Sequence, residues 1–290
     1  MKIESKDGAE PLVSIVIPCY EGARYLPQAI ESVLNQSYRN LQVLIVDDAS
    51  PDNCAEIAGH YAARDPRVQV IRRSKNGGVS AAFNSGFEVA KGEFFSRLAQ
   101  DDYFRDDAIE VMLTELRKNP DAGMVYCDDQ HVDEDGNFLR FARKGSPGLS
   151  VKANAIGLCV MWRRLVWEKV GKFDSAYDAA EDYEYWLRVR QHFRLCHCPD
   201  APLFVRIHDR MGSRVFYLRQ SLLNACLAAK HTPSFVARRR GLAEDYFEIG
   251  YNVGLQKQKR TALRLLLQSI WYWPFSLKPY KCFVKFLLFP

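Results

Sequence analysis

The chain has 290 residues, of which 48% are hydrophobic and 26% are charged. This balance is that of a folded globular protein and excludes a largely disordered chain, while the formal net charge of +5 is too small to identify an anionic partner by itself. At this length the chain can form one large domain, or one domain with a helical appendage.

Eight cysteines are spread along the chain without a repeated spacing. In a chain of this size such a distribution argues against a disulfide framework, so we expect reduced thiols. The first ten residues are polar and charged and lack the apolar stretch of a signal peptide. We therefore expect a cytoplasmic protein.

The first half of the chain alternates between strand-like and helix-like segments. Short runs rich in β-branched and aromatic residues predict strands at Val13 to Ile17, Val43 to Val46, Val68 to Ile71 and Phe94 to Leu98. Apolar residues at helical spacing predict helices between them, at about 26–34, 53–63 and 80–90. This order is typical of a parallel α/β sheet, in which ligands bind at the edge formed by the carboxyl ends of the strands.

The second half is less regular. We predict a strand at Met124 to Tyr126, a tight hairpin turn at Asp135-Gly136 and a helix at Glu181 to Arg190. From Tyr217 onward the pattern is helical, with breaks expected at three prolines, which are Pro233, Pro274 and Pro279.

Acidic residues directly follow two of the predicted strands. Asp47-Asp48 ends the second strand, and Gln100-Asp101-Asp102 follows the fourth. Carboxylates at such positions can accept hydrogen bonds from a nucleobase or ribose, and adjacent ones can share a divalent cation with substrate phosphates. The alternative is structural, because the same residue types cap helices. Two acidic strand ends in one sheet favour the functional interpretation.

Three later motifs also allow either a structural or a functional interpretation. Glu181-Asp182 starts a predicted helix, where a carboxylate either complements the helix dipole or serves as a general base. His208, in Arg206-Ile207-His208, belongs to a residue type that is more often structural than a ligand. The segment from Cys196 to Cys198 superficially resembles a zinc site, but its spacing is not the C-x₂₋₄-C of zinc pairs.

Together these motifs resemble the family 2 glycosyltransferases, which are inverting enzymes with the GT-A fold. Seven matching segments follow the family's order between Pro11 and Arg214: VIPCY at 16–20, VDDASPD at 46–52, NGGVSAA at 76–82, KGEF at 91–94, QDD at 100–102, EDY at 181–183 and RIH at 206–208. The resemblance implies an α/β fold of the Rossmann-like GT-A type, with a mixed, mainly parallel sheet flanked by helices, and a catalytic domain at residues 1–215. Beyond Arg214 the resemblance fades, and the helical pattern predicts a C-terminal helical extension at 216–290, which we expect to associate with the acceptor or a membrane.

The resemblance also implies a nucleotide-binding set. Its members are Pro18, Tyr20, Glu21, Asp48, Gly78, Gln100 and Asp101. In this set the Tyr20 ring is expected to pack on the base, and Asp48 to hydrogen-bond the base or the ribose.

The metal and catalytic residues follow from the same resemblance. Asp101 matches the last Asp of the family's Asp-x-Asp element and, with Asp102 and His208, is expected to hold Mn²⁺ or Mg²⁺ on the donor diphosphate. Asp182 matches the general base. The implied partners are a nucleotide-diphospho-sugar donor, with a UDP-sugar favoured, and a glycan or lipid-linked saccharide acceptor, but no nucleic acid.

Three residues depart from the family pattern: Ala99 replaces the first Asp of Asp-x-Asp, Glu21 replaces a common Asn, and Phe83 replaces an Arg that often precedes Asn84. Two alternatives therefore stay open. One is an inactive nucleotide-sugar-binding or scaffold protein, which Ala99 favours. The other is a sugar nucleotidyltransferase, against which the lack of a Gly-rich, basic loop near the N-terminus argues.

The C-terminal segment from Thr261 to Pro290 is the nearest candidate for a membrane span, but four basic residues interrupt it, so it lacks the ~18 uncharged apolar residues that a span requires. Its eight tryptophan, tyrosine and phenylalanine residues after position 270 are interspersed with three lysines. This mixture suits peripheral contact at the inner face of a membrane, and equally suits amphipathic packing onto a protein core.

Overall fold

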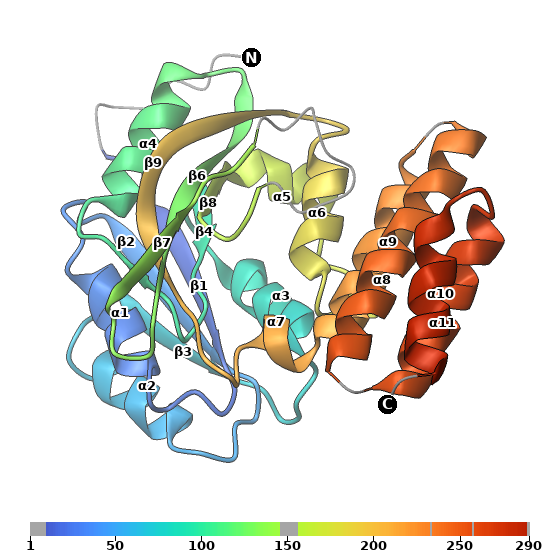
Figure 1. Cartoon of the computed structure of the whole chain (residues 1–290). Helices are drawn as coiled ribbons and strands as arrows, with labels where there is room; N and C mark the ends of the chain where they lie inside the picture. The colour runs from blue at the N-terminus through green and yellow to red at the C-terminus, as the bar shows by residue number, and fades with distance from the viewer. Residues whose placement is uncertain (1–9, 146–155, 233, 257, 289–290) are drawn as a thin grey trace. The chain divides into compact units, whose positions relative to one another are not determined.

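The computed structural model describes residues 10–145, 156–232, 234–256 and 258–288 (Figure 1). The chain divides into two compact units, of which the first runs to Met211 and the second begins at Gly212. The predicted boundary after residue 215 separates a catalytic from an acceptor-associated part, and that division by function stays a prediction.

A mixed sheet, nine-stranded in the described part of the chain, forms the centre of the first unit. Its strands are β1 (Val13–Cys19), β2 (Leu41–Asp47), β3 (Val68–Arg72), β4 (Phe94–Arg97), β5 (Tyr103–Phe104), β6 (Ala122–Val132), β7 (Phe138–Ala142), β8 (Val160–Arg163) and β9 (Arg194–Arg206). They are ordered β3-β2-β1-β4-β8-β6-β9-β5, and β7 pairs with β6. The first four strands in this order are parallel, as the β-α-β pattern predicts, whereas β8 runs antiparallel to both β4 and β6.

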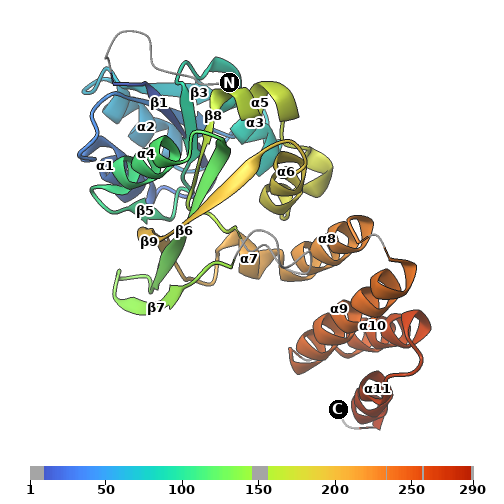
Figure 2. The same cartoon turned by 90° about the horizontal axis from the view of Figure 1, so that it is seen from above.

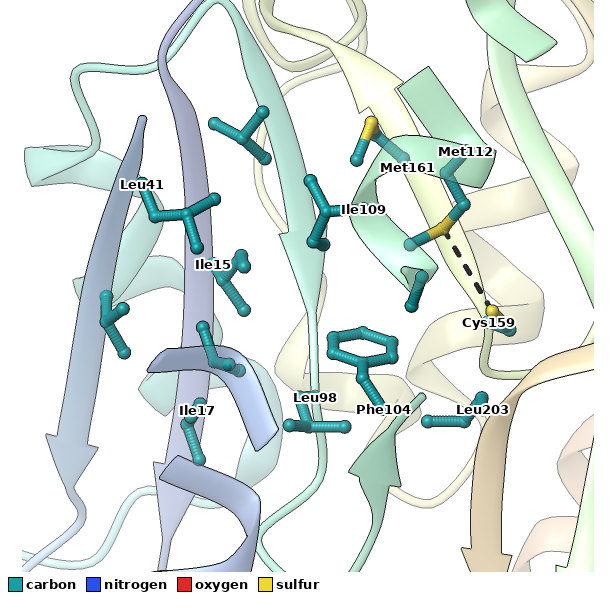
Figure 3. Packing of buried hydrophobic residues seen from close by; sticks show 14 of the residues in the cluster. Ile15, Ile17, Leu41, Leu98, Phe104, Ile109, Met112, Cys159, Met161 and Leu203 are labelled. Atoms are coloured by element: carbon teal, nitrogen blue, oxygen red, sulfur yellow. Dashed lines mark hydrogen bonds between the residues drawn. The ribbon is translucent and has the colours of Figure 1, made fainter. Parts of the chain in front are cut away.

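Helices cover both faces of this sheet (Figure 1). They are α1 (Leu26–Leu34), α2 (Cys54–Ala62) and α4 (Ala108–Lys118) on one face, and α3 (Val79–Val89), α5 (Arg164–Val170) and α6 (Glu181–Val189) on the other, with a short 3₁₀ helix at Ser175–Tyr177. The alternation of side chains along β1 explains the two layers, since Ile15 and Ile17 face the first set of helices and Val16 faces the second. Figure 3 shows the first core, where Ile15 lies among Leu98, Phe104 and Ile109.

The second unit is helical, as predicted from Tyr217 onward. It contains α7 (Gly212–Val215), α8 (Tyr217–Lys230), α9 (Phe235–Leu255), α10 (Lys259–Tyr272) and α11 (Leu277–Leu288). Helices α9 and α10 lie side by side (Figure 2) and bury Ile249, Val253, Ala262 and Leu265 between them and their neighbours. Among the described residues, no helix is long and apolar enough to cross a membrane.

The proline breaks were predicted with mixed success. Pro274 lies between α10 and α11, as expected, and Pro233 lies outside the described residues. The break predicted at Pro279 is wrong, because α11 begins at Leu277 and includes this proline in its first turn. The backbone N–H groups of a first turn have no partner within the helix, so a proline there removes no helical hydrogen bond.

The strands and helices predicted in the first half are confirmed within a few residues. The elements that the sequence did not reveal lie after β4 in the first unit, and they are β5, α4, β7, β8, α5 and the full length of β9. Strand β9 has 13 residues and is buried along most of its length, so it lacks the alternation of a half-exposed strand.

Two helical glycines allow a test of how tightly α3 packs on the sheet. A Cβ atom added at Gly86 would lie 2.5 Å from Val16 Cγ1, whereas one added at Gly59 in α2 would have only Arg72 Nη2, at 4.0 Å. We expect Gly86→Ala to lower the free energy of unfolding by about 1–3 kcal/mol through overpacking. Gly59→Ala should raise it by about 0.5–1 kcal/mol through helix propensity. Urea unfolding of both variants checks this; a stabilising Gly86→Ala would contradict the close approach of α3 to β1.

Candidate active site

The loop after β1 is fastened to the loop after β4 by one side chain. The Gln100 amide accepts a hydrogen bond from Tyr20 N–H (2.8 Å) and donates one to the Tyr20 carbonyl oxygen (2.9 Å). A Cβ atom at Gly22 would lie 2.0 Å from Gln100 Oε1, so this contact requires a glycine. Tyr20 itself is 40% exposed, and its ring is therefore available at the edge of the sheet.

Asp48 lies at the end of β2, almost fully buried, and organises the turn before α3. Its carboxylate accepts hydrogen bonds from Gly77 N–H (3.1 Å) and Gly78 N–H (2.9 Å) and pairs with Arg73 (3.1 Å). Since each carboxylate oxygen has about two acceptor positions, these contacts occupy most of its capacity. A hydrogen bond that the Asp48 carboxylate accepts directly from a base or ribose stays a prediction.

Asp101 and His208 meet at the opposite side of this edge. His208 Nε2 lies 2.9 Å from Asp101 Oδ2, and the Asp101 side chain is the more exposed of the two. Asp102 points elsewhere, because it is buried and its Oδ1 accepts a hydrogen bond from Arg206 N–H (3.0 Å). Burial and the neighbouring Asp101 charge hold the pKa of the Asp102 carboxyl group well above its usual range.

Arg206 forms hydrogen bonds to several segments around Asp101 and His208. Its guanidinium donates to the backbone carbonyls of Asp101, Asp133 and Glu134 and to the Gln28 side chain. It also lies over the ring of Tyr25, 4.9 Å from the centroid, and that ring packs against His208. Arg206 therefore connects the β4 loop, the β6–β7 hairpin and α1.

The third acidic motif, Glu181-Asp182, starts α6. Glu181 and Asp182 are both buried, and Asp182 Oδ1 accepts a hydrogen bond from Tyr183 N–H (2.6 Å). Arg97, at the end of β4, pairs with Glu181 (3.8 Å), and its guanidinium lies 4.8 Å from the centroid of the Phe83 ring. Burial and the charge of Asp182 raise the pKa of Glu181 to about 7, although Arg97 opposes this shift.

A third contact links the α6 loop to the turn that Asp48 organises. Asp178 Oδ1 accepts a hydrogen bond from Ser80 N–H (3.2 Å), and a Cβ atom at Gly78 would lie 2.0 Å from Asp178 Oδ2. Gly78 also has a φ of 85°, which disfavours any other residue. The sequence motifs around Asp48, Asp101 and Asp182 thus lie in loops that contact one another.

Strained backbone is concentrated in these same loops. The described residues with positive φ that are not glycine are Glu21 (51°), Ala49 (57°) and Ala179 (85°). They directly follow Tyr20, Asp48 and Asp178. Such conformations cost of order 1–3 kcal/mol each and are typical of functional sites.

The structure does not bring together the residues of the zinc alternative. Cys196 and Cys198 are buried in the core beneath α4, whereas the His197 ring bonds Asp128 (2.7 Å) and stacks on Tyr126. Within the described ranges, no group of three or more His, Cys, Asp and Glu residues is arranged to hold a metal ion.

Sequence reasoning did not single out Arg97, Asp178 or Arg206 as parts of this site. The sequence could have pointed to Arg206, because this residue lies two positions before His208 in the same motif. It could not have pointed to Arg97 and Asp178, since their partners Glu181 and Ser80 are 84 and 98 residues away in the chain.

Comparison with known proteins places this arrangement in a family. The model of the family described as Glycosyl transferase family 2 matches residues 14–168, which is more than half of the chain. The chain belongs to glycosyl transferase family 2. Chondroitin synthase of Escherichia coli is 31% identical over 184 residues, which cover 62% of this chain and 27% of that protein. Hyaluronan synthase of Pasteurella multocida is 30% identical, with 62% and 19% covered. This family 2 chain thus spans about a quarter or less of the length of these curated relatives.

Solved structures share the fold at low sequence identity. TarS residues 1–349 of S. aureus, solved in complex with UDP-GlcNAc, has a TM-score of 0.65 at 17% identity, with 90% of this chain and 81% of that chain covered. The mannosyltransferase PcManGT from Pyrobaculum calidifontis, in complex with GDP-Man and Mn²⁺, has a TM-score of 0.64 at 17% identity, with 96% and 80% covered. The predicted GT-A fold with a helical C-terminal part is confirmed.

The raised pKa of Glu181 predicts a pH-dependent stability. In the unfolded chain this carboxyl titrates near 4.5 and in the folded chain near 7, so between these values the folded state binds more protons. Its stabilising contribution is therefore complete below pH 4.5 and is lost as the pH rises through 7. We expect wild type to lose roughly 3 kcal/mol more than Glu181→Gln between pH 4.5 and pH 8. Denaturant unfolding at both pH values checks this, and parallel pH profiles would contradict it.

Proposed function

We propose that this chain transfers a sugar from a nucleotide-diphospho-sugar to a hydroxyl group of an acceptor, with inversion at the anomeric carbon. Family membership supports glycosyl transfer. The observation that carries the proposal for this chain is the meeting of three acidic loops at one sheet edge, through the contacts of Gln100 with Tyr20, Gly78 with Asp178 and Arg97 with Glu181. Donor, cation and base have to act within one small volume, and this edge supplies groups for all three.

The donor nucleotide is proposed to bind between the loops after β1 and β2. The exposed Tyr20 ring suits stacking on the base; Pro18 lies near the end of β1 and Glu21 in the loop that follows it. Asp48, Gly78 and Gln100 shape the loops around it through the contacts described above. We favour a UDP-sugar; TarS was solved with UDP-GlcNAc and PcManGT with GDP-Man, so both nucleotides belong in a test.

The pair Asp101 and His208 fits a divalent cation. The Asp101 carboxylate suits Mn²⁺ or Mg²⁺, which take one or two carboxylate ligands together with substrate phosphates, and His208 Nε2, 2.9 Å from Asp101 Oδ2, is the second proposed ligand. When bound there, the cation would offset negative charge on the departing diphosphate. Asp102 fits less well, because its side chain is buried and its Oδ1 accepts a hydrogen bond from Arg206 N–H.

The proposed transfer needs a single base. The acceptor oxygen forms a bond to the anomeric carbon as the bond from that carbon to the diphosphate breaks, and the diphosphate leaves with the electron pair. Asp182 accepts the proton of the acceptor hydroxyl. Attack from the face opposite the leaving group inverts the centre, so no covalent sugar intermediate is required.

The acceptor is proposed to be a glycan or a lipid-linked saccharide in polysaccharide synthesis, reached by a cytoplasmic enzyme whose C-terminal helices make peripheral contact with a membrane. The exposed aromatic and aliphatic side chains of that unit support the contact. Two relatives named chondroitin synthase and hyaluronan synthase support a glycan acceptor.

The overall proposal is tested by incubating the chain with UDP-, GDP- and dTDP-sugars, Mn²⁺ and a broad panel of acceptors. Release of nucleoside diphosphate with a matching glycosylated product supports it. Donor binding without hydrolysis or transfer would favour the inactive nucleotide-sugar-binding protein. Ala99, which replaces the first Asp of Asp-x-Asp, is the residue that favours this alternative. Release of inorganic pyrophosphate from a nucleoside triphosphate and a sugar phosphate would favour the nucleotidyltransferase.

Replacing the proposed base separates chemistry from binding. We expect Asp182→Asn to lower the turnover number at least 100-fold, because the amide cannot accept the proton, and to change the donor dissociation constant less than threefold. Steady-state kinetics and calorimetric donor titration measure the two effects. Unchanged turnover would remove Asp182 as the base.

The neighbouring residues Asp101 and Asp102 provide a test variant and a matched control for the proposed cation site. Asp101→Asn should raise the Mn²⁺ concentration for half-maximal donor hydrolysis at least tenfold, since it removes a proposed ligand. Asp102→Asn should change it less than about threefold, because Asp102 is buried and the amide oxygen of asparagine can accept the same hydrogen bond from Arg206 N–H. An equal loss in both variants would contradict the assignment of the cation to Asp101.

A further inference from the structure

The two units of the chain differ sharply in charge. Residues 212–290 contain 13 Lys and Arg against 3 Asp and Glu, a formal net charge of +10. The preceding 211 residues contain 27 against 32, a formal net charge of −5. The small overall charge thus conceals a strongly basic helical unit, which attracts anionic surfaces within a Debye length.

Large apolar side chains are exposed at several places in this unit, and five of the most exposed lie at one end. Phe235, Val236, Trp271, Phe275 and Leu277 are between 57% and 80% exposed, and we call these five residues the aromatic end. They belong to the first turn of α9, the last turn of α10 and the segment that leads into α11. Single exposed apolar residues are common, but five from three consecutive helices need an explanation.

Contacts of Arg239 show that these residues lie together. Its guanidinium donates to the carbonyls of Trp271 (2.9 Å) and Tyr272 (3.1 Å) and lies over the rings of Phe235 (5.8 Å) and Trp271 (5.2 Å). The start of α9 therefore adjoins the end of α10. Farther along, the Tyr251 ring packs on Phe286 (6.1 Å), so α11 returns along α9 and its start also lies at this end.

Basic side chains surround the aromatic end. Arg240 in α9 and Lys278 and Lys281 in α11 are exposed within a few residues of it, while Arg238 and Arg239 are partly buried. Apolar side chains that project beyond a basic rim suit a bilayer interface, where rings and aliphatic groups enter below the headgroups and cations pair with anionic lipids.

We infer that the aromatic end of the C-terminal unit inserts into the interface of a bilayer that contains anionic lipids. This names the lipid class and the contacting residues for the peripheral contact proposed above, and it does not depend on the donor chemistry. A nucleic acid would be attracted by the same charge, but it presents no apolar layer to receive five exposed apolar side chains. A lipid surface satisfies both features at once.

The experiment is co-sedimentation of the full chain with vesicles of phosphatidylcholine alone or with 30% phosphatidylglycerol. Wild type should partition at least tenfold more strongly onto the anionic vesicles, in a manner that salt weakens. The triple variant W271A/F275A/L277A should lose at least tenfold of this binding, because burying even one large apolar side chain changes a partition constant by about that factor. These residues are exposed, so folding should persist and circular dichroism checks it.

Two further variants make the test specific. The control L255A removes an exposed leucine at the opposite end of α9 and should bind like wild type. The charge variant K278E/K281E should lose preference for the anionic vesicles. Donor hydrolysis in solution, measured in parallel, should be the same for wild type and the triple variant, so failure of the membrane inference and failure of the proposed enzyme activity are distinguishable.

Three outcomes would overturn the inference. Equal binding of wild type and the triple variant would remove the aromatic end from the contact. Self-association of wild type that the triple variant abolishes, without vesicle binding, would make this end an interface between copies. Tight binding of duplex DNA in the absence of vesicle binding would identify the basic unit as a nucleic-acid surface.

Discussion

Negative charge gathers at the carboxyl edge of the sheet, and the basic groups of the first unit are placed to offset it. Three buried or half-buried carboxylates described above have a basic partner, namely Asp48 with Arg73, Asp101 with His208 and Glu181 with Arg97. Carboxylates this close repel one another, and burial adds a desolvation cost to each, so the arrangement persists only with nearby cations and donors. At Asp102, burial and the neighbouring Asp101 charge outweigh the effect of Arg97 and raise the pKa of the carboxyl group.

Backbone donors and strained turns complete this arrangement. Asp48 is satisfied largely by the N–H groups of Gly77 and Gly78, which only a turn with positive φ at Gly78 can direct toward it. Glu21, Ala49 and Ala179 adopt similar conformations without being glycine. The surrounding hydrogen bonds over-determine these turns, so that the motif residues are held before any ligand arrives.

The structure shows the surroundings of two residues that depart from the family pattern, Phe83 and Ala99. Phe83, in place of an arginine, does not leave α3 without a cation nearby, because the Arg97 guanidinium lies over its ring and reaches Glu181. Ala99 forms the turn after β4, in which its carbonyl accepts a hydrogen bond from Asp102 N–H (3.2 Å). His208 Nε2 lies 2.9 Å from Asp101 Oδ2 in the presence of Ala99.

The sequence by itself determined both the strands and the helices of the first half of the chain, together with the motif residues at the strand ends. These features depend on local periodicity and on residue types at fixed spacing. The sequence also determined the basic, aromatic character of the C-terminal helices. Only the tertiary structure decided which acidic residue at a strand end is exposed. Asp101 and Asp102 are neighbours of identical chemistry, and the path of β9 alone turns one toward His208 and the other toward Arg206 N–H. The contacts of Arg97 with Glu181 and of Gly78 with Asp178 were likewise decided by the fold, since they join segments about 84 to 100 residues apart and no local pattern records such a pairing.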